Sequence, residues 1–369
     1  MRILQISSAR VYGGGERHVR DLFHGLIERG HQVFAALRPT NTWEDKLDFL
    51  PTENILHTSI RNSFGILSSK RIADFVRENE IEIVHAHVAR DYIPASIACI
   101  LAKKPKFILT RHVLFEMKPF NRFALKNLSK AIAVSSAVES NLKRIFPADK
   151  IAVIPNGIDI GRHSPEETQK LREEFRTFHQ IPQDAPLIGT LGELIELKGQ
   201  REFIVAANEV VKEFPDARFV VVGKDHSLDQ KFRRELRRLA RIFGLEEKFL
   251  WLDWLDDTAP FFAALDIFVS ASHIESFGLA ILEAMASGVA VVATETAGAS
   301  ELLGNGEFLV PIKDPVKLAL AICDLLANAE KRLAASLEIR QRAVENFSAE
   351  KMIAATEKLY RQVLSGRSG

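Results

Sequence analysis

The sequence is poor in cysteine. Its 369 residues include only Cys99 and Cys323, which lie far apart. Each stands inside an apolar helical pattern, as expected for buried thiols in a reducing compartment. The chain therefore offers neither a disulfide framework nor a cysteine-based metal site.

Long hydrophobic runs are also missing. The longest predominantly apolar stretch, residues 93–102, is about half of the roughly 20 residues that span a bilayer. The first residues carry one arginine and an apolar run that ends at Gln5, so they do not read as a signal peptide. We expect a cytoplasmic protein without a transmembrane helix.

The chain has little net charge, since 49 Lys and Arg face 48 Asp and Glu. The charge is unevenly placed, because residues 101–150 hold 11 Lys and Arg but 3 Asp and Glu. This excess suits an anionic acceptor, an anionic lipid surface or a solvated basic face. Nucleic acid is disfavoured as a partner because no nucleic-acid-binding motif accompanies the charge.

The patterns that are present indicate an α/β protein. Hydrophobic residues make up 47% of the chain, and its length suits two domains. Short β-type apolar runs alternate with segments of helical period in two successive series. We predict two Rossmann-like domains, residues 1–157 and 158–347, followed by a final helix at about 348–369.

Gly13, Gly14 and Gly15 lie between the first predicted strand and a helix. Glycines at this position let backbone amides approach an anionic or sugar ligand, although they also suit a tight turn. A dehydrogenase would show G-x-G-x-x-G and an acidic residue after the second strand, where this chain has Arg38 and Pro39. Hydride transfer is therefore disfavoured.

Residues 270–288, SASHIESFGLAILEAMASG, place two carboxylates eight positions apart, at Glu275 and Glu283. We expect the helix to open at Ser276 or Phe277 and to offer its first amides to a diphosphate. Carboxylates accept hydrogen bonds from sugar hydroxyls. An apolar stripe on another helix face leaves Glu283 for a ligand or, alternatively, for solvent.

This segment resembles the signature of the retaining glycosyltransferases of family 4. The resemblance extends over nearly the whole chain, through VYGGGERHV, VSSAV at Ser135, IPNGID, LKGQ at Lys198 and TAGASELL. It implies the two-domain glycosyltransferase B fold, with a cleft between the domains and a final helix that returns to the first. It also implies that the second domain holds the donor and the first the acceptor, without metal or cofactor.

The resemblance assigns roles to individual residues. Glu283 would bind the ribose hydroxyls, Glu275 the transferred sugar and Lys198 the diphosphate, whose charge grows as the glycosidic bond breaks. His112, at a predicted strand end, would contact the reacting sugar and the acceptor. The catalytic set is His112, Lys198 and Glu275; the donor set is Gly14, Gly15, Gly192, Lys198, Glu275, Ser276, Phe277, Gly278, Leu279 and Glu283; the acceptor set is Gly13, His112 and Ser135.

Two positions depart from the family pattern. Glu193 stands where the family usually has an arginine that would face the diphosphate, and Asp253 stands where relatives often have glycine. Separately, His85 and His87 alternate on one strand, a spacing compatible with metal ligation. We expect no metal there, because no carboxylate or cysteine accompanies them at diagnostic spacing.

The sequence thus predicts a retaining hexosyl-type transferase of cell-envelope glycan or glycolipid synthesis, using a UDP-, GDP- or ADP-sugar. A sugar-nucleotide epimerase and a non-catalytic nucleotide-sugar-binding protein are the alternatives. The basic, Phe-rich stretch from Lys103 to Lys126 suits an anionic membrane surface, which would place the protein at the inner face of the membrane.

Overall fold

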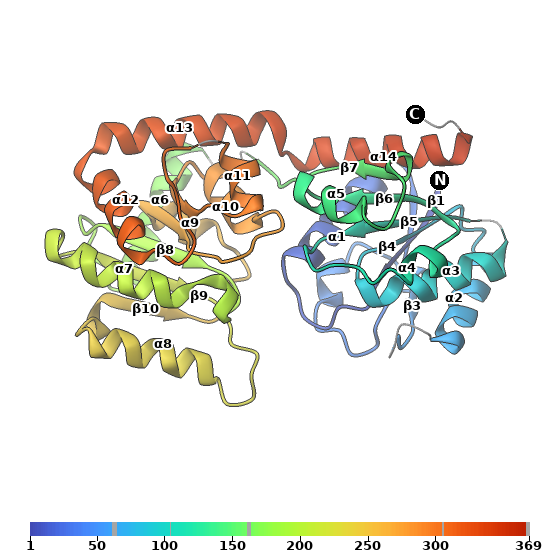
Figure 1. Ribbon diagram of the computed structural model, residues 1–369, viewed down its shortest axis with the longest axis horizontal. Helices are drawn as coiled ribbons and strands as arrows, with labels where there is room; N and C mark the ends of the chain where they lie inside the picture. The colour runs from blue at the N-terminus through green and yellow to red at the C-terminus, as the bar shows by residue number, and fades with distance from the viewer. Residues whose placement is uncertain (61–64, 104, 161–163, 305, 367–369) are drawn as a thin grey trace. The chain divides into compact units, whose positions relative to one another are not determined.

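The computed structural model describes residues 1–60, 65–103, 105–160, 164–304 and 306–366 (Figure 1). The chain divides into two compact units, which we call unit 1 (Met1–Ile158 with Phe347–Gly369) and unit 2 (Asp159–Asn346). Each unit has its own parallel sheet and its own hydrophobic core. In the described ranges, no helix is long and apolar enough to cross a membrane.

Unit 1 is built on a parallel sheet that, in the described residues, has seven strands in the order β3-β2-β1-β4-β5-β6-β7. Its central strands are buried along almost their whole length, which explains why they read as continuous apolar runs. The strands are β1 (Arg2–Ser7), β2 (Gln32–Leu37), β3 (Ile55–His57), β4 (Ile83–Ala86), β5 (Lys106–Arg111), β6 (Leu128–Ala133) and β7 (Ile151–Val153).

The connections of unit 1 are mostly helical. On the first helix, Val19, Leu22 and Phe23 are fully buried at helical spacing, as an amphipathic helix against a sheet requires. The helices are α1 (Gly14–Glu28), α2 (Ile66–Glu78), α3 (Tyr92–Ala102), α4 (Asn121–Ala124), α5 (Ser136–Leu142) and α14 (Ala349–Ser365). Short 3-10 helices are η1 (Glu44–Leu47), η2 (Thr52–Asn54), η3 (Ala89–Asp91) and η4 (Ala148–Lys150).

The last helix, α14, returns to unit 1, as the sequence predicts (Figure 1). It packs against α1 at Gly25, where a Cβ atom would overlap the side chain of Ile353. Glu357 pairs with Arg29 at 2.8 Å and with His31 at 3.0 Å. Helix α14 thus belongs to the core of unit 1. Residues 367–369 of the predicted final helix lie outside the described residues.

Unit 2 repeats the same plan. Its sheet is parallel and, within the described ranges, has six strands in the order β10-β9-β8-β11-β12-β13. The strands are β8 (Leu187–Leu191), β9 (Arg218–Val222), β10 (Phe249–Leu252), β11 (Ile267–Ser270), β12 (Ala290–Thr294) and β13 (Leu309–Val310).

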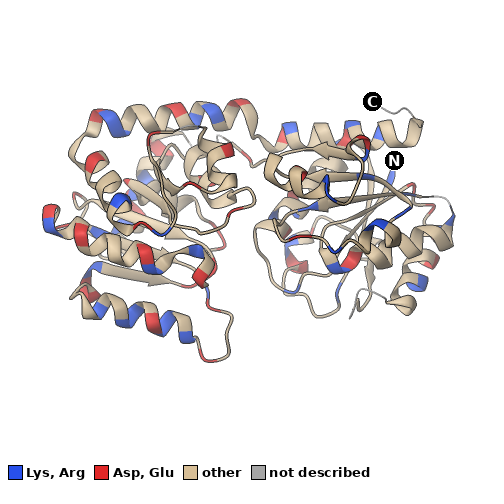
Figure 2. Ribbon diagram, viewed as in Figure 1, with Lys and Arg blue, Asp and Glu red and all other residues tan. Residues whose placement is uncertain are grey.

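The helices of unit 2 include α8, which buries Leu236 and Ala240 and carries six lysines and arginines with one carboxylate, Glu235 (Figure 2). This arrangement is that of a solvated amphipathic helix. The helices are α6 (Pro165–Phe178), α7 (Gln200–Glu213), α8 (Lys231–Ile242), α9 (Ala259–Ala264), α10 (Leu279–Ala286), α11 (Ala297–Leu303), α12 (Pro315–Ala327) and α13 (Ala329–Asn346), with 3-10 helices η5 (Glu196–Lys198) and η6 (Glu246–Lys248).

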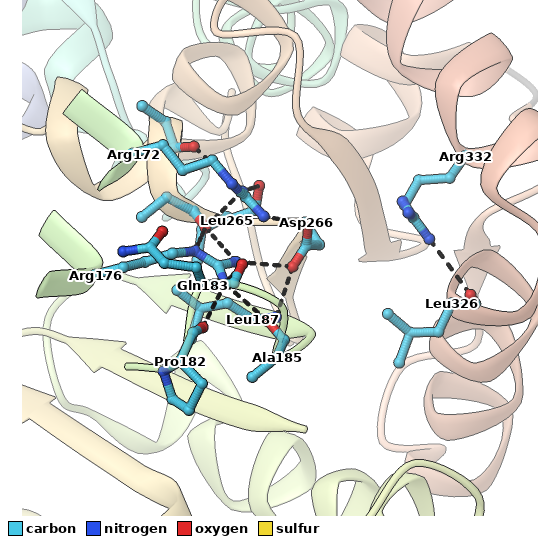
Figure 3. A network of polar contacts seen from close by, with 12 residues as sticks. Arg172, Arg176, Pro182, Gln183, Ala185, Leu187, Leu265, Asp266, Leu326 and Arg332 are labelled. Atoms are coloured by element: carbon cyan, nitrogen blue, oxygen red, sulfur yellow. Dashed lines mark hydrogen bonds and ion pairs between the residues drawn. The ribbon is translucent and has the colours of Figure 1, made fainter. Parts of the chain in front are cut away.

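The buried Arg176 of α6 binds to groups at the amino ends of β8 and β11 through hydrogen bonds and an ion pair (Figure 3). The Arg176 side chain is 0% exposed and pairs with Asp266 at 3.0 Å. Its remaining N–H groups donate to backbone carbonyls, and Asp266 also accepts the Leu187 amide at 2.7 Å and pairs with Arg172. The carbonyls belong to Ala264, Pro182, Gln183 and Ala185. This network stabilises the sheet edge opposite the carboxyl ends of the strands.

Both sheets show the strand order of the Rossmann-like fold, so the predicted fold class is confirmed. In each, the order of the strands reverses at one point, between β1 and β4 in unit 1 and between β8 and β11 in unit 2. Ligands of such sheets bind outside the carboxyl ends of the strands at this switch point. The residues that follow these four strands are therefore the first candidates for a site.

Candidate functional site

In unit 2, the predicted donor residues follow the two strands at the switch point. Gly192 and Lys198 come after β8, and Glu275 comes after β11. The structure brings the last two together, with the Lys198 Nζ 2.5 Å from the Glu275 Oε1. An ammonium and a carboxylate are therefore placed at the edge of the sheet where the fold predicts a ligand.

The surroundings of this ion pair hold it in place. Ser272 Oγ donates to the same Glu275 oxygen at 2.9 Å. Gly199, directly after Lys198, has φ +67, and a Cβ atom there would overlap the backbone carbonyl of Ala271. Only glycine combines this backbone conformation with so close an approach. Ser272 joins this candidate site through its contact with Glu275, and the sequence did not reveal it because a serine three positions before a glutamate has no distinctive pattern.

Helix α10 begins later than predicted. Its first helical residue is Leu279, and Gly278 precedes it with φ +97. The left-handed conformation of Gly278 lies outside the right-handed helical region, so the helix cannot begin at Ser276 or Phe277. The amides of the first helical turn are those from Leu279 onward, and the preceding loop is fixed by the Gly298 amide, which donates to the Glu275 carbonyl at 3.0 Å.

Glu283 lies on α10 and is 9% exposed. It accepts a hydrogen bond from the Thr258 hydroxyl at 2.8 Å. The alternative of a solvated helix residue is therefore wrong, and Glu283 is a buried carboxylate that a nearby hydroxyl orients. Thr258 lies 25 positions earlier in the chain, so only the fold could connect it to the motif.

The two departures from the family pattern occupy different surroundings. Glu193 is exposed, and its backbone carbonyl accepts a hydrogen bond from the Gln200 side chain at 2.9 Å. Asp253 forms an ion pair with the buried Arg233, so its charge is balanced within unit 2. Asp253 thus has a structural partner that the sequence did not predict.

In unit 1, the three glycines stand where α1 begins. Gly13 is the N-terminal cap in an extended conformation, and Gly14 and Gly15 form the first helical positions. Ser135 caps α5 by accepting the Val138 amide at 3.3 Å, and its side chain is buried. The ligand contacts expected of these four residues stay predictions.

Histidines gather at the switch point of unit 1. His87 follows β4, His112 follows β5, and His18 lies on α1. His112 Nε2 is 3.5 Å from His87 Nδ1, and the ring of His18 stands edge-on to that of His112 at 4.8 Å between centroids. The sequence pointed to His112 but not to His18. The two residues are far apart along the chain, so no local pattern indicated that their rings are in contact.

A hydrogen-bonded network lies beneath these rings. The Gln5 side chain contacts His87 Nε2 at 2.8 Å through its oxygen and the Tyr360 hydroxyl at 3.1 Å through its nitrogen. His85 uses both ring nitrogens, toward Tyr360 at 2.6 Å and Thr110 at 2.7 Å. The network therefore connects α14, through Tyr360 and Gln5, to the histidines at the sheet edge.

Burial keeps the imidazoles uncharged. It lowers the pKa of His18 to about 4 and lowers the pKa values of His85, His87 and His112 well below the usual range, with a further contribution from the neighbouring rings. At neutral pH these side chains are neutral hydrogen-bonding groups and potential ligands. His112 therefore does not supply a positive charge.

Comparisons with known proteins agree with this arrangement. The model of the Glycosyltransferase Family 4 family matches residues 12–162, and that of Glycosyl transferases group 1 matches residues 185–328. The lipopolysaccharide core biosynthesis glycosyltransferase LpsE of Rhizobium meliloti is 26% identical, over 96% of each chain. A GDP-mannose-dependent monoacylated α-(1-6)-phosphatidylinositol monomannoside mannosyltransferase of Corynebacterium glutamicum is 27% identical, over 87% of each.

Solved structures share the fold over the full length. A glycosyltransferase from Rickettsia africae superposes with a TM-score of 0.84 at 26% identity, covering 98% of each chain. Anabaena HepE in complex with UDP-glucose has a TM-score of 0.82 at 23% identity, covering 99% of this chain and 100% of HepE.

Proposed function

Because the chain belongs to family 4 of the retaining glycosyltransferases, we propose that it transfers a hexose-type sugar from a nucleoside-diphosphate sugar to a cell-envelope glycan or glycolipid. The observation that carries the proposal is the Lys198–Glu275 ion pair at the switch point of unit 2, with the buried Glu283 on the following helix. The pair supplies one cation for phosphate and one carboxylate for hydroxyls at the expected place.

Each residue of this group has a part in holding the donor. Glu283, buried and oriented by Thr258, accepts hydrogen bonds from the ribose hydroxyls. Lys198 exchanges its contact with Glu275 for the diphosphate, and Glu275 then turns its oxygens to the sugar hydroxyls. The amides that open α10 add partial positive charge near the diphosphate.

The reaction breaks the bond between C1 of the sugar and the diphosphate oxygen. A new bond forms from C1 to the acceptor hydroxyl oxygen on the same face, and the hydroxyl proton passes to an oxygen of the departing diphosphate. Lys198 stabilises the negative charge that develops on the leaving group. His112, neutral at physiological pH, provides hydrogen bonds to the reacting sugar and acceptor.

An acceptor at a membrane surface is supported by the segment that follows β5 and includes the short helix α4. Phe115, Phe120 and Phe123 are 66%, 53% and 74% exposed, with the exposed cations Lys118 and Arg122 among them. Aromatic side chains between cations are suited to the interface of an anionic membrane. We propose that this surface, which we call the Phe-rich surface, holds the protein at the inner face of the membrane. Lys104, in the predicted basic stretch, lies outside the described residues.

The donor site is tested by thermal unfolding with UDP-, GDP- and ADP-sugars. A ligand that binds only the native state raises the unfolding temperature. One class of nucleotide sugar should raise it for the wild-type protein and much less for Lys198→Ala, whereas Lys212→Ala on the exposed face of α7 should respond like wild type. A shift that survives in Lys198→Ala would remove Lys198 from the donor site.

The membrane proposal is tested by co-sedimentation with phosphatidylglycerol and phosphatidylcholine vesicles. The protein should bind the anionic vesicles more tightly, and salt should release it. Replacing Phe115, Phe120 and Phe123 by serine should abolish this binding. Phe178→Ser, at a phenylalanine of unit 2 that is 81% exposed, should not. Equal binding to both vesicle types would indicate an acceptor in solution.

A further inference from the structure

Three imidazoles meet at the switch-point edge of the unit 1 sheet. They come from three separate elements: His18 from α1, His87 from the end of β4 and His112 from the end of β5. One nitrogen of each ring lies within 4.8 Å of the nitrogens of the other two. His18 and His87 are buried, and His112 is half-buried.

Several of these nitrogens have no hydrogen-bond partner. Both ring nitrogens of His18 and Nδ1 of His112 are buried and unpaired among the residues that the structure describes. Buried polar atoms in proteins are nearly always hydrogen-bonded, and an unpaired one indicates a ligand, an ion or a water molecule. Three such atoms in two adjacent rings make this the least satisfied polar cluster of the described chain.

The His87 ring is held as a metal ligand is held in known sites. Its Nε2 contacts the Gln5 side-chain oxygen at 2.8 Å, and Gln5 is itself fixed by Tyr360. This contact places the ring proton on Nε2 and leaves the Nδ1 lone pair toward His112. Metal-ligating histidines usually donate their second nitrogen to an oxygen in this way, which sets both tautomer and orientation.

We propose that His18, His87 and His112 form a binding site for one divalent transition-metal ion, such as Zn²⁺. Three neutral imidazoles with one open position are a known zinc ligand set, whereas Mg²⁺ and Ca²⁺ require oxygen ligands. Metal–nitrogen distances of about 2.0 to 2.1 Å need only small rotations of rings whose nitrogens already lie within 4.8 Å. His85, which alternates with His87 on the same strand and for which the sequence predicted no metal, is excluded because Tyr360 and Thr110 engage both its nitrogens.

The bound metal ion would inhibit sugar transfer. Coordination occupies a nitrogen of His112, and on the function proposed above His112 must contact the sugar and acceptor. Only this inhibitory role rests on the proposed function; the metal site itself stands on the geometry of unit 1. Transfer needs no metal under this scheme.

The test is titration of the full, chelator-treated chain with Co²⁺, followed by Zn²⁺, without any nucleotide sugar. One Co²⁺ per chain should give the intense visible absorption of a four-coordinate site, and Zn²⁺ should displace it. His18→Ala should abolish this absorption and weaken zinc binding by about 100-fold or more, and Gln5→Ala should weaken it by about 10- to 100-fold as the loss of an orienting partner does.

His24→Ala provides the matched control, because His24 is an exposed histidine on the same helix and should leave the titration unchanged. Circular dichroism and thermal unfolding check each variant, and His18→Gln replaces His18→Ala if the smaller side chain destabilises the fold. The proposed site would be overturned if the protein did not bind one metal ion per chain, or if the cobalt absorption spectrum were the same in wild type and in the His18 variants. Stoichiometric zinc that leaves transfer unaffected would overturn the inhibitory role.

Discussion

Two carboxylates of unit 2 differ sharply in their surroundings. Glu283 is buried beside Thr258, whereas Glu193 is exposed after β8. A buried carboxylate is costly unless its hydrogen bonds are satisfied, and a bound ligand with hydroxyls contributes such bonds. Glu283 is therefore the candidate binding group of the two, and we expect the two residues to respond differently to substitution.

Replacing Glu283 by glutamine should weaken donor binding while leaving the fold intact. Glutamine keeps an oxygen for Thr258 but removes the charge that strengthens hydrogen bonds to the ribose hydroxyls. The expected loss of donor affinity is on the order of 1 to 3 kcal/mol. Calorimetric titration of the donor measures it, with Glu338→Gln on the exposed face of α13 as the control. An unchanged affinity would remove Glu283 from the donor site.

Replacing Glu193 by arginine should strengthen donor binding. Reversing a negative charge beside a diphosphate is expected to add about 1 to 2 kcal/mol in a partly desolvated site. The gain should shrink with salt, and Glu338→Arg, which makes the same charge change on α13, should not produce it. If turnover falls at constant donor affinity, Glu193 has a contact of its own, with the acceptor or a neighbouring cation.

At the level of single residues, the sequence predicted those in contiguous motifs. Lys198, Glu275 and Glu283 stand in short patterns, and the structure places the first two in contact. Ser272, Thr258 and His18 escaped notice because they join the site from distant positions or without a pattern. Such partners depend on the tertiary fold, which no local spacing encodes.

At the level of elements, α10 shows why its boundary was predicted too early. Phe277, which precedes Gly278, is apolar like the residues of the helix that follows, so the pattern predicts a helix that begins at about Phe277. The helix instead begins after Gly278, whose φ of +97 lies outside the helical region. Glycine adopts this conformation without the strain that a Cβ atom adds. A difference of two or three residues changes which amides can meet the diphosphate.

The packing of α6 against the sheet depends on the charge of Asp266, which balances that of the buried Arg176. Asp266→Ala should lower the free energy of unfolding of unit 2 by about 3 to 5 kcal/mol, because Arg176 would be left buried without its counter-charge. Urea unfolding followed by circular dichroism measures this loss. Glu209→Ala, which removes the exposed partner of Lys212, should change stability by no more than about 0.5 kcal/mol. A loss below about 1 kcal/mol for Asp266→Ala would mean that the carbonyls suffice for Arg176.

At the scale of the whole molecule, helix α14 belongs to unit 1 together with residues Met1–Ile158, although unit 2 lies between them in the sequence. Tyr360 of α14 is fully buried and contacts Gln5 and His85 of the unit 1 sheet. The final helix therefore contributes to the sheet edge that carries His112, besides covering the core. Deleting it would expose that core.

The stability of unit 1 should depend on pH through Glu357 of α14, which contacts Arg361 on the same helix and Arg29 and His31 outside it. Contacts with Arg361, His31 and Arg29 lower the pKa of Glu357 to about 2 from its usual value of 4.5. The folded state binds this proton less readily than the unfolded state, so its contribution is present above about pH 4.5 and is lost as the pH falls toward 2.

Urea unfolding of unit 1 between pH 6 and pH 3 tests this dependence, with about one pH unit between samples. Glu357→Gln should show a smaller decline of stability on acidification than wild type. Glu350→Gln, which removes an exposed partner of Arg29 on the same helix, should retain the wild-type decline. Parallel curves for wild type and Glu357→Gln would show that another group carries the acid sensitivity.

The fold class could be predicted from the sequence because parallel strands buried on both faces leave continuous apolar runs, and the intervening helices leave a different period. The return of α14 came from the family resemblance, and the structure confirms it at Gly25 and Ile353. The histidine group of unit 1 could not be predicted, because His18 reaches it from a helix whose register against the sheet is set by packing.

The most direct test of the transferase assignment is proton NMR of a nucleotide sugar incubated with the protein and water as the acceptor. A retaining transferase releases the sugar with the anomeric configuration of the donor, before mutarotation mixes the two forms. We expect this retained anomer, formed about 100-fold more slowly by Lys198→Ala because a fixed charge beside the leaving group is lost. Release of the inverted anomer, or equal release by Lys198→Ala, would contradict it.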